Sequence, residues 1–273
     1  MVAFFTKTSI GYSHIGAKKP CQDFSASYHD EERTIVTACD GHGGDIYIRS
    51  QLGSRFASDS IISVLKGLDK SSFYKYTERE IADKIRLNIL CEWNNLVEAH
   101  LEAKPIAKRE MTALQPKDIA RLKSNPATAY GTTLQGVMIL GNKLVCVSLG
   151  DGGVFLVRRG EIKEAFEEDE ETVANLTYSM CQANAYEHLK VKIFDFSALD
   201  GAIVCTDGLV NPYQSLSNFN QSLVKPICVK LIERDYEEIE SFVKRLGTEI
   251  GIGDDVSLGV AIRKSTSLRS YKR

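Results

Sequence analysis

The most informative stretch of this chain is Thr34-Ile-Val-Thr-Ala-Cys-Asp-Gly-His-Gly-Gly44. Its first six residues, β-branched or small and apolar, predict a buried strand. Asp40 then stands at the rigid end of that strand, and the glycines let backbone groups approach a ligand closely. The Asp40 carboxylate and the Gly41 carbonyl oxygen suit a hard cation, and His42 is a candidate proton carrier. The alternative is an ordinary strand-to-helix turn that contains Asp and Gly.

Composition and charge exclude several classes of protein. The chain has 273 residues, of which 43% are hydrophobic and 26% charged, enough to bury a sizeable core. The 34 basic and 36 acidic residues give a net charge of -2, which indicates no nucleic-acid or membrane partner. No apolar run approaches the ~18 residues of a membrane-spanning helix, and the N-terminus lacks a signal-peptide pattern. We therefore expect a cytoplasmic protein.

The cysteines indicate a reducing compartment. There are seven, scattered and without a Cys-x-x-Cys pair, and several, such as Cys39, Cys146 and Cys205, lie in apolar strand-like runs. Buried free thiols explain this pattern better than disulfides or zinc ligands do.

Hydrophobic periodicity gives the order of the elements. Turn signals and alternation predict strands at about residues 3–13, 22–29, 34–39, 130–140, 143–149, 154–158, 161 onward, 191–196, 202–206 and 256–262. Apolar residues at helical spacing predict helices at about 45–66, 78–102 and 222–246. The polar, proline-broken stretch 104–128 is expected to be a surface excursion with at most a short helix.

Nothing in the sequence divides the chain. No repeat and no long linker is present, so we expect one domain over residues 1–263. Residues 264–273 carry four basic residues and no acidic one, and are expected to form a short disordered tail.

Five aspartates share one placement, at a strand boundary and, in four of the five cases, beside a glycine: Asp23, Asp40, Asp151, Asp207 and Asp254. An all-oxygen cluster suits magnesium or manganese better than zinc. Carboxylates brought together repel one another unless cations neutralise them, and two ions ~3.5–4 Å apart can ionise a water and hold a phosphoryl oxygen. The alternative is five unrelated turn aspartates.

At this point the sequence resembles a known family. The motifs are Cys21-Gln22-Asp23, Asp40-Gly41-His42-Gly43-Gly44, Gly131-Thr132-Thr133, Gly150-Asp151, Thr206-Asp207-Gly208 and Asp254-Asp255-Val256-Ser257. They occur in the order found in the metal-dependent type 2C serine/threonine protein phosphatases, from about residue 9 to residue 263. The resemblance implies an α+β fold, in which two antiparallel sheets pack as a central sandwich flanked by pairs of helices.

The resemblance also implies the metal ligands. Asp40 would bridge two Mg²⁺ or Mn²⁺ ions, with the Gly41 carbonyl on one of them. Asp207 and Asp254 would complete the ligands of the second ion, and Asp23 would act through a metal-bound water. Asp151, together with Asp207, would hold a weaker third ion.

The remaining roles concern the phosphate and the proton. His42 resembles the proposed general acid, and the irregular stretch 167–187 matches the variable flap that influences substrate choice. Lys18 stands where many members have a phosphate-gripping arginine, and Lys19 adjoins it. A lysine supplies positive charge without a bidentate fork, although both residues could also be ordinary solvated lysines.

Other departures from the family pattern place the chain near a bacterial-type branch. Gln22 stands where many members have glutamate, which drops one charge near the metals. Asp255 replaces a common asparagine, and Gly152-Gly153 replaces a usual Ser-Arg-type pair.

The resulting prediction is a monomeric phosphatase that hydrolyses phosphoserine and phosphothreonine in proteins, through in-line attack by a metal-bridging hydroxide. A catalytically weak pseudophosphatase or sensor module of the same fold is one alternative, and a small-molecule phosphatase is another. A cysteine-dependent phosphatase is disfavoured, because Cys21 and Cys39 lack the arginine of a Cys-x5-Arg loop.

Overall fold

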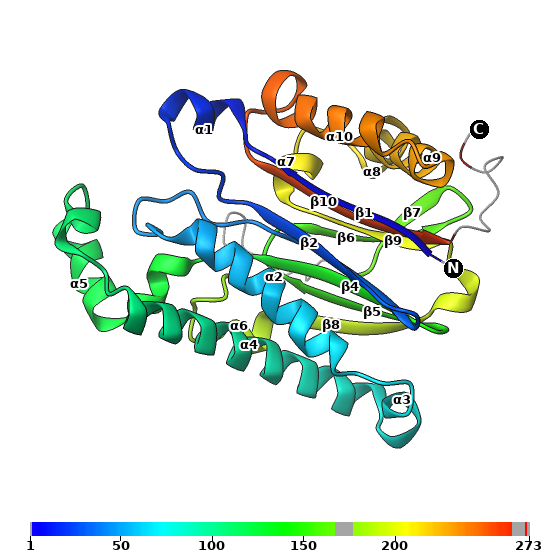
Figure 1. Cartoon of the computed structure of the whole chain (residues 1–273), viewed down its shortest axis with the longest axis horizontal. Coiled ribbons are helices and arrows are strands. Elements are labelled where there is room, and N and C mark those ends of the chain that lie inside the picture. Colours follow the sequence, from blue (N-terminus) through cyan, green and yellow to red (C-terminus); the bar gives the residue numbers. More distant parts are fainter. Residues whose placement is uncertain (1, 167–176, 264–270, 272–273) are drawn as a thin grey trace.

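The computed structural model describes residues 2–166, 177–263 and 271 (Figure 1). Their ten strands form two antiparallel five-stranded sheets, ordered β1-β10-β9-β6-β7 and β2-β3-β4-β5-β8. The strands are β1 Val2–Ser9, β2 Phe24–His29, β3 Arg33–Cys39, β4 Leu134–Leu140, β5 Lys143–Leu149, β6 Gly153–Arg158, β7 Glu161–Glu164, β8 Lys190–Asp195, β9 Gly201–Cys205 and β10 Val256–Arg263.

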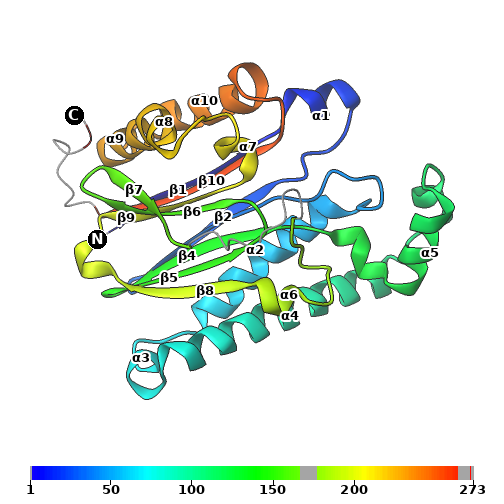
Figure 2. The same cartoon turned by 180° about the vertical axis from the view of Figure 1, so that it is seen from behind.

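Helices cover the outer faces of both sheets. The α-helices are α1 Tyr12–Ala17, α2 Ser50–Lys66, α3 Ser72–Lys75, α4 Glu78–Ala103, α5 Pro116–Ser124, α6 Ala185–His188, α7 Asp207–Val210, α8 Leu216–Phe219, α9 Lys225–Glu233 and α10 Tyr236–Arg245. Short 3-10 turns are η1 Lys108–Met111, η2 Pro126–Tyr130 and η3 Phe196–Ala198, and π-helical turns are η4 Asn220–Val224 and η5 Leu246–Ile250. The long helices α2 and α4 lie on the β2-β3-β4-β5-β8 sheet, and α9 and α10 lie on the other (Figures 1 and 2). The expected α+β sandwich flanked by helix pairs is confirmed.

Burial on both faces explains the near-continuous apolar runs of the central strands. In β4, Leu134 and Met138 face the helices, whereas Val137 and Ile139 face the other sheet. Successive strand residues point to opposite faces, so a strand with two covered faces has no polar side.

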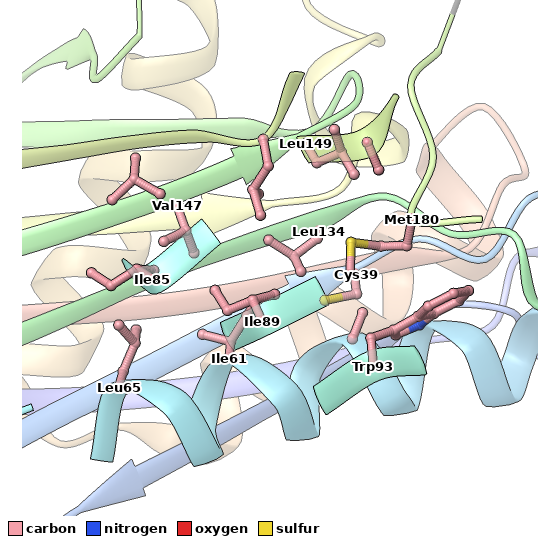
Figure 3. Packing of buried hydrophobic residues seen from close by; sticks show 14 of the residues in the cluster. Cys39, Ile61, Leu65, Ile85, Ile89, Trp93, Leu134, Val147, Leu149 and Met180 are labelled. Carbon is pink, nitrogen blue, oxygen red and sulfur yellow. The ribbon is translucent and has the colours of Figure 1, made fainter. Parts of the chain in front are cut away.

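The larger helix–sheet core is built from regular helical spacing. Ile85, Ile89 and Trp93 of α4 lie with Ile61 of α2 against the side chains of β4 and β5 (Figure 3). Thr77 begins α4 with a reciprocal capping box to Glu80.

The predicted first strand is too long. β1 ends at Ser9, and residues 12–17 form α1. The chain turns at Gly11, where a Cβ would stand 2.3 Å from the Asp254 backbone carbon. This approach between residues far apart in sequence leaves no mark in the local pattern.

Three other boundaries also differ. α2 begins at Ser50 rather than at residue 45. The excursion 104–128 holds more helix than expected: η1, the nine-residue α5 and the start of η2, because Pro116 and Pro126 begin helical turns instead of breaking them. The predicted strand from residue 130 begins only at Leu134.

Parts of the sequence-based predictions lie outside the described residues. These are flap residues 167–176 and all of the tail except Tyr271, whose side chain is buried in the core beneath α9 and α10. The division into one domain and a tail therefore stays a prediction. All seven cysteines are free, and five of them are buried, as expected. Of the helices within residues 2–166 and 177–263, none is both long enough and apolar enough to cross a membrane.

Two substitutions on one helix test the core. Ile89→Ala should lower the free energy of unfolding by about 2–5 kcal/mol, because Ile89 is fully buried and its loss leaves a cavity. Leu87→Ala, on the exposed side of α4, should change it by less than about 0.5 kcal/mol. Urea unfolding in chelator measures both, and equal effects would contradict the assigned faces of α4.

Candidate active site

Asp40 is held in place by its main chain. Its carbonyl oxygen accepts hydrogen bonds from the Thr133 amide at 2.8 Å and the Thr132 hydroxyl at 2.7 Å. Its amide donates to Thr133 Oγ1 at 3.1 Å. The end of β3 is thereby fixed to the residues that lead into β4, which leaves the Asp40 carboxylate free for a ligand.

Gly41 and His42 continue this fixed backbone. The Gly41 amide donates to the Gln22 carbonyl, and the His42 amide donates to the Gly131 carbonyl, both at 3.1 Å. A Cβ on Gly41 would lie 2.6 Å from the carbonyl oxygens of Gln22 and Ser50, so no larger residue fits without movement. The glycine is required by backbone approach, as the motif suggested.

Asp23 lies directly behind Asp40. Thr206, which follows β9, donates to Asp23 Oδ2 at 2.8 Å. Burial, followed by the charge of Asp40, raises the pKa of Asp23 well above its ordinary value. Asp23 therefore holds a proton more tightly than an exposed carboxyl group does.

Four of the predicted aspartates act on one another electrostatically. Burial and then the charge of Asp207 raise the pKa of Asp40 to about 7, with smaller effects from Asp151 and Asp254. Burial and the charges of Asp151 and Asp254 raise the pKa of Asp207 to about 6. The structure thus brings together two carboxylates that follow β3 and β9 and two from the loops before β6 and β10.

These carboxylates do not form a closed ligand cage. Within the described part of the chain, no group of three or more His, Cys, Asp or Glu side chains is spaced to hold a metal ion. Carboxylate oxygens are nevertheless the donors that a magnesium-like ion takes, one or two at a time, while it keeps several waters. The donors present are oxygens, and the mutual repulsion recorded in the raised pKa values is what a cation would relieve.

His42 is half-buried, whereas the two lysines are exposed. Burial lowers the pKa of His42, and the charge of Asp151 opposes this effect; its ring lies 4.9 Å from that of Tyr47 between centroids. Lys18 and Lys19 are exposed at the end of α1, where Lys18 has a left-handed backbone with φ of 55°. The structure shows no contact between the lysine side chains and the carboxylates.

A family model described as Protein phosphatase 2C matches residues 10–242. The chain belongs to the protein phosphatase 2C family. It is therefore a metal-dependent protein phosphatase of the serine/threonine class. A search of curated proteins found no match.

Solved bacterial structures share the protein phosphatase 2C fold. A bacterial serine phosphatase aligns with a TM-score of 0.58 at 13% identity, over 96% of each chain. Mycobacterium tuberculosis PstP/Ppp aligns at 0.54 and 16% identity, over 96% of this chain and 98% of that one. Staphylococcus aureus Stp1 aligns at 0.55 and 12% identity, over 96% and 95% respectively.

Three residues around the phosphatase site have roles that the sequence did not reveal. Asp255 is buried, and its carboxylate accepts hydrogen bonds from the Gly11 amide, the Gln22 amide and His14 Nδ1 at 2.6–2.9 Å. Gln22 donates from Nε2 to the His42 carbonyl, while its buried Oε1 lacks a partner among the described residues. Thr177 donates to Asp151 Oδ2 at 2.6 Å. The Asp255 and Gln22 departures from the family pattern were the only signals for these contacts.

The raised pKa values predict a pH effect on the metal-free protein. Asp207 has a folded-state pKa of about 6, above its ordinary 3.8. Its contribution to stability is thus complete below about pH 4 and is lost as the pH rises through about 6. Asp207→Asn should reduce this loss of stability with rising pH. At pH 7 in chelator, it should raise the free energy of unfolding by on the order of 1–2 kcal/mol. Glu98→Gln, exposed on α4, is the control for loss of one charge. A destabilised Asp207→Asn would contradict the repulsion.

Proposed function

We propose that this chain removes phosphate from phosphoserine and phosphothreonine in proteins, with Mg²⁺ or Mn²⁺ held by its strand-end aspartates. The observation that carries the proposal is the shared repulsion among Asp40, Asp207, Asp151 and Asp254. Such a cluster is unfavourable by itself and becomes favourable with bound cations. Membership of a metal-dependent phosphatase family supports this interpretation.

Each aspartate would have its own part in metal binding. Asp40 and the Gly41 carbonyl would contact the two core ions, with Asp207 and Asp254 as further ligands. Asp23, which is buried and close enough to Asp40 for the Asp40 charge to raise its pKa, suits an indirect role. Asp151 would hold a weaker third ion with Asp207. The catalytic domain of PstP, which shares this fold, was crystallised with two manganese ions.

The residues of the chain would position the phosphate and move a proton. When bound, the cations would lower the pKa of water and screen the charge of the phosphoryl group. Lys18 and Lys19, free of ion pairs with described residues, would bind phosphate oxygens as point charges. As the oxygen of water attacks phosphorus and the bond to the serine or threonine oxygen breaks, His42 would protonate the leaving oxygen.

The family match does not favour the alternatives, a pseudophosphatase, sensor module or small-molecule phosphatase. A cysteine nucleophile is opposed by burial, which raises the pKa of the Cys39 thiol well above its ordinary value. We propose in addition that the protein is a cytoplasmic monomer without nucleic-acid or membrane partners.

The direct test is phosphate release from a phosphothreonine peptide after removal of metals with a chelator. Activity should be absent, return with Mn²⁺ or Mg²⁺, and survive alkylation of accessible thiols, since the proposed chemistry uses carboxylates. Metal-independent activity, or loss on alkylation with the fold intact by circular dichroism, would contradict the proposal.

His42→Ala tests the proton donor. Turnover of a phosphothreonine peptide should fall by ~10²-fold or more, because an alkoxide leaving group needs a proton. For p-nitrophenyl phosphate, whose leaving group needs little protonation, the loss should be only a few-fold. The lowered pKa of His42 further predicts that the wild-type advantage shrinks as the pH rises, since less of the imidazole is protonated. Equal losses on both substrates would remove His42 from this role.

A further inference from the structure

Four large apolar side chains are exposed around α1. Tyr12 and Ile15 of α1 are 48% and 51% exposed, and Ile250 and Ile252, which precede β10, are 59% and 52% exposed. They are four of the nine exposed large hydrophobic residues in the described chain. We call them the α1 surface.

Contacts hold the two segments of this surface together. The Tyr12 hydroxyl lies 3.5 Å from the Ile252 carbonyl oxygen, and the Tyr12 ring covers Gly253, where a Cβ would be 2.5 Å from Tyr12 Cζ. Ile15 follows Tyr12 by three residues and so lies on the same side of the helix. Figures 1 and 2 both show α1 beside the segment that enters β10.

Core packing does not account for these side chains. α1 has only six residues and none is buried, and a helix of this length is unstable alone. It is instead held by polar contacts: the Asp255 carboxylate accepts from the Gly11 amide and from His14 Nδ1, and the Ser13 amide donates to the Gly253 carbonyl at 3.1 Å. The fold thus maintains a short rigid helix whose apolar side chains face solvent.

Two residues of the proposed site, Lys18 and Asp254, follow residues of the α1 surface closely along the chain. Lys18 comes one helical turn, ~5 Å, after Ile15. Asp254, a proposed metal ligand, comes two residues, at most ~7 Å, after Ile252. About two residues of an extended peptide cover such distances.

We infer that the α1 surface binds apolar residues that flank a phosphoserine or phosphothreonine in the protein substrate. Charge complementarity supports this occupant: Lys18 and Lys19, which form no ion pair with any described residue, adjoin the surface, as a phosphate would adjoin the flanking apolar residue. Its size also suits a short peptide, because four partly exposed side chains fall short of the ~800 Å² per partner that a stable protein interface buries. This inference rests on the proposed phosphatase activity and narrows its substrates.

The test compares two phosphothreonine peptides. One carries leucine and the other carries serine at the positions within two residues on either side of the phosphothreonine, and the two are otherwise identical. With Mn²⁺, the wild-type chain should hydrolyse the leucine peptide with a kcat/KM about tenfold higher, mostly through KM. Ile15→Ser combined with Ile252→Ser should remove this preference. Tyr74→Ser combined with Leu87→Ser, which changes two exposed apolar residues elsewhere, should retain it.

The outcomes separate this inference from the proposed function. Equal hydrolysis of both peptides by the wild-type chain would overturn the inference and leave the phosphatase intact. Hydrolysis of neither peptide would overturn both. Sedimentation velocity tests a second copy of the chain as the occupant: a dimer that the Ile15/Ile252 double variant dissociates, with the peptide preference unchanged, would also overturn the inference.

Discussion

The repulsion among clustered carboxylates is the constraint on which this site depends. Asp40 and Asp207 follow strands of different sheets, β3 and β9, and repulsion from neighbouring carboxylates raises the pKa of each. A flexible scaffold would let such groups move apart into water. The sandwich prevents this, because β3 and β9 are buried on both faces by the inter-sheet core and by their covering helices. Core packing therefore maintains an unfavourable charge cluster that cations can stabilise.

Hydroxyl groups connect the two sheets at this edge. Thr206, which follows β9, donates to Asp23 at the start of β2, and its Oγ1 accepts a hydrogen bond from the Ser257 amide of β10 at 2.9 Å. Thr132 and Thr133 fix the backbone of Asp40 in a similar way. A threonine hydroxyl both donates and accepts without adding charge, so it can orient an acidic residue without increasing the repulsion.

The sequence was most informative where chemistry and periodicity are local. The apolar stripe of α4 predicted a helix packed on a sheet, the family resemblance implied the two-sheet sandwich, and the aspartates at strand ends predicted the acidic cluster. The sequence was least informative where distant segments determine the backbone. The end of the first predicted strand, at about residue 13, falls within α1, because the contacts of Gly11 with Asp254 and Asp255 are absent from its local pattern. The stretch 104–128 was misjudged for a local reason, because Pro116 was interpreted as a break although it begins α5.

The dipeptide Asp254-Asp255 links the metal site to the α1 surface. Asp254 is exposed, whereas Asp255 is buried and directed to Gly11, Gln22 and His14. These donors compensate the charge of Asp255, and its effect on the pKa of Asp23 ranks behind those of burial and Asp40. The Asp255 amide in turn donates to Asp254 Oδ1 at 2.9 Å. The position of α1 and that of a proposed metal ligand are thus linked through one residue, because the carboxylate that holds α1 and the amide that orients Asp254 belong to the same amino acid.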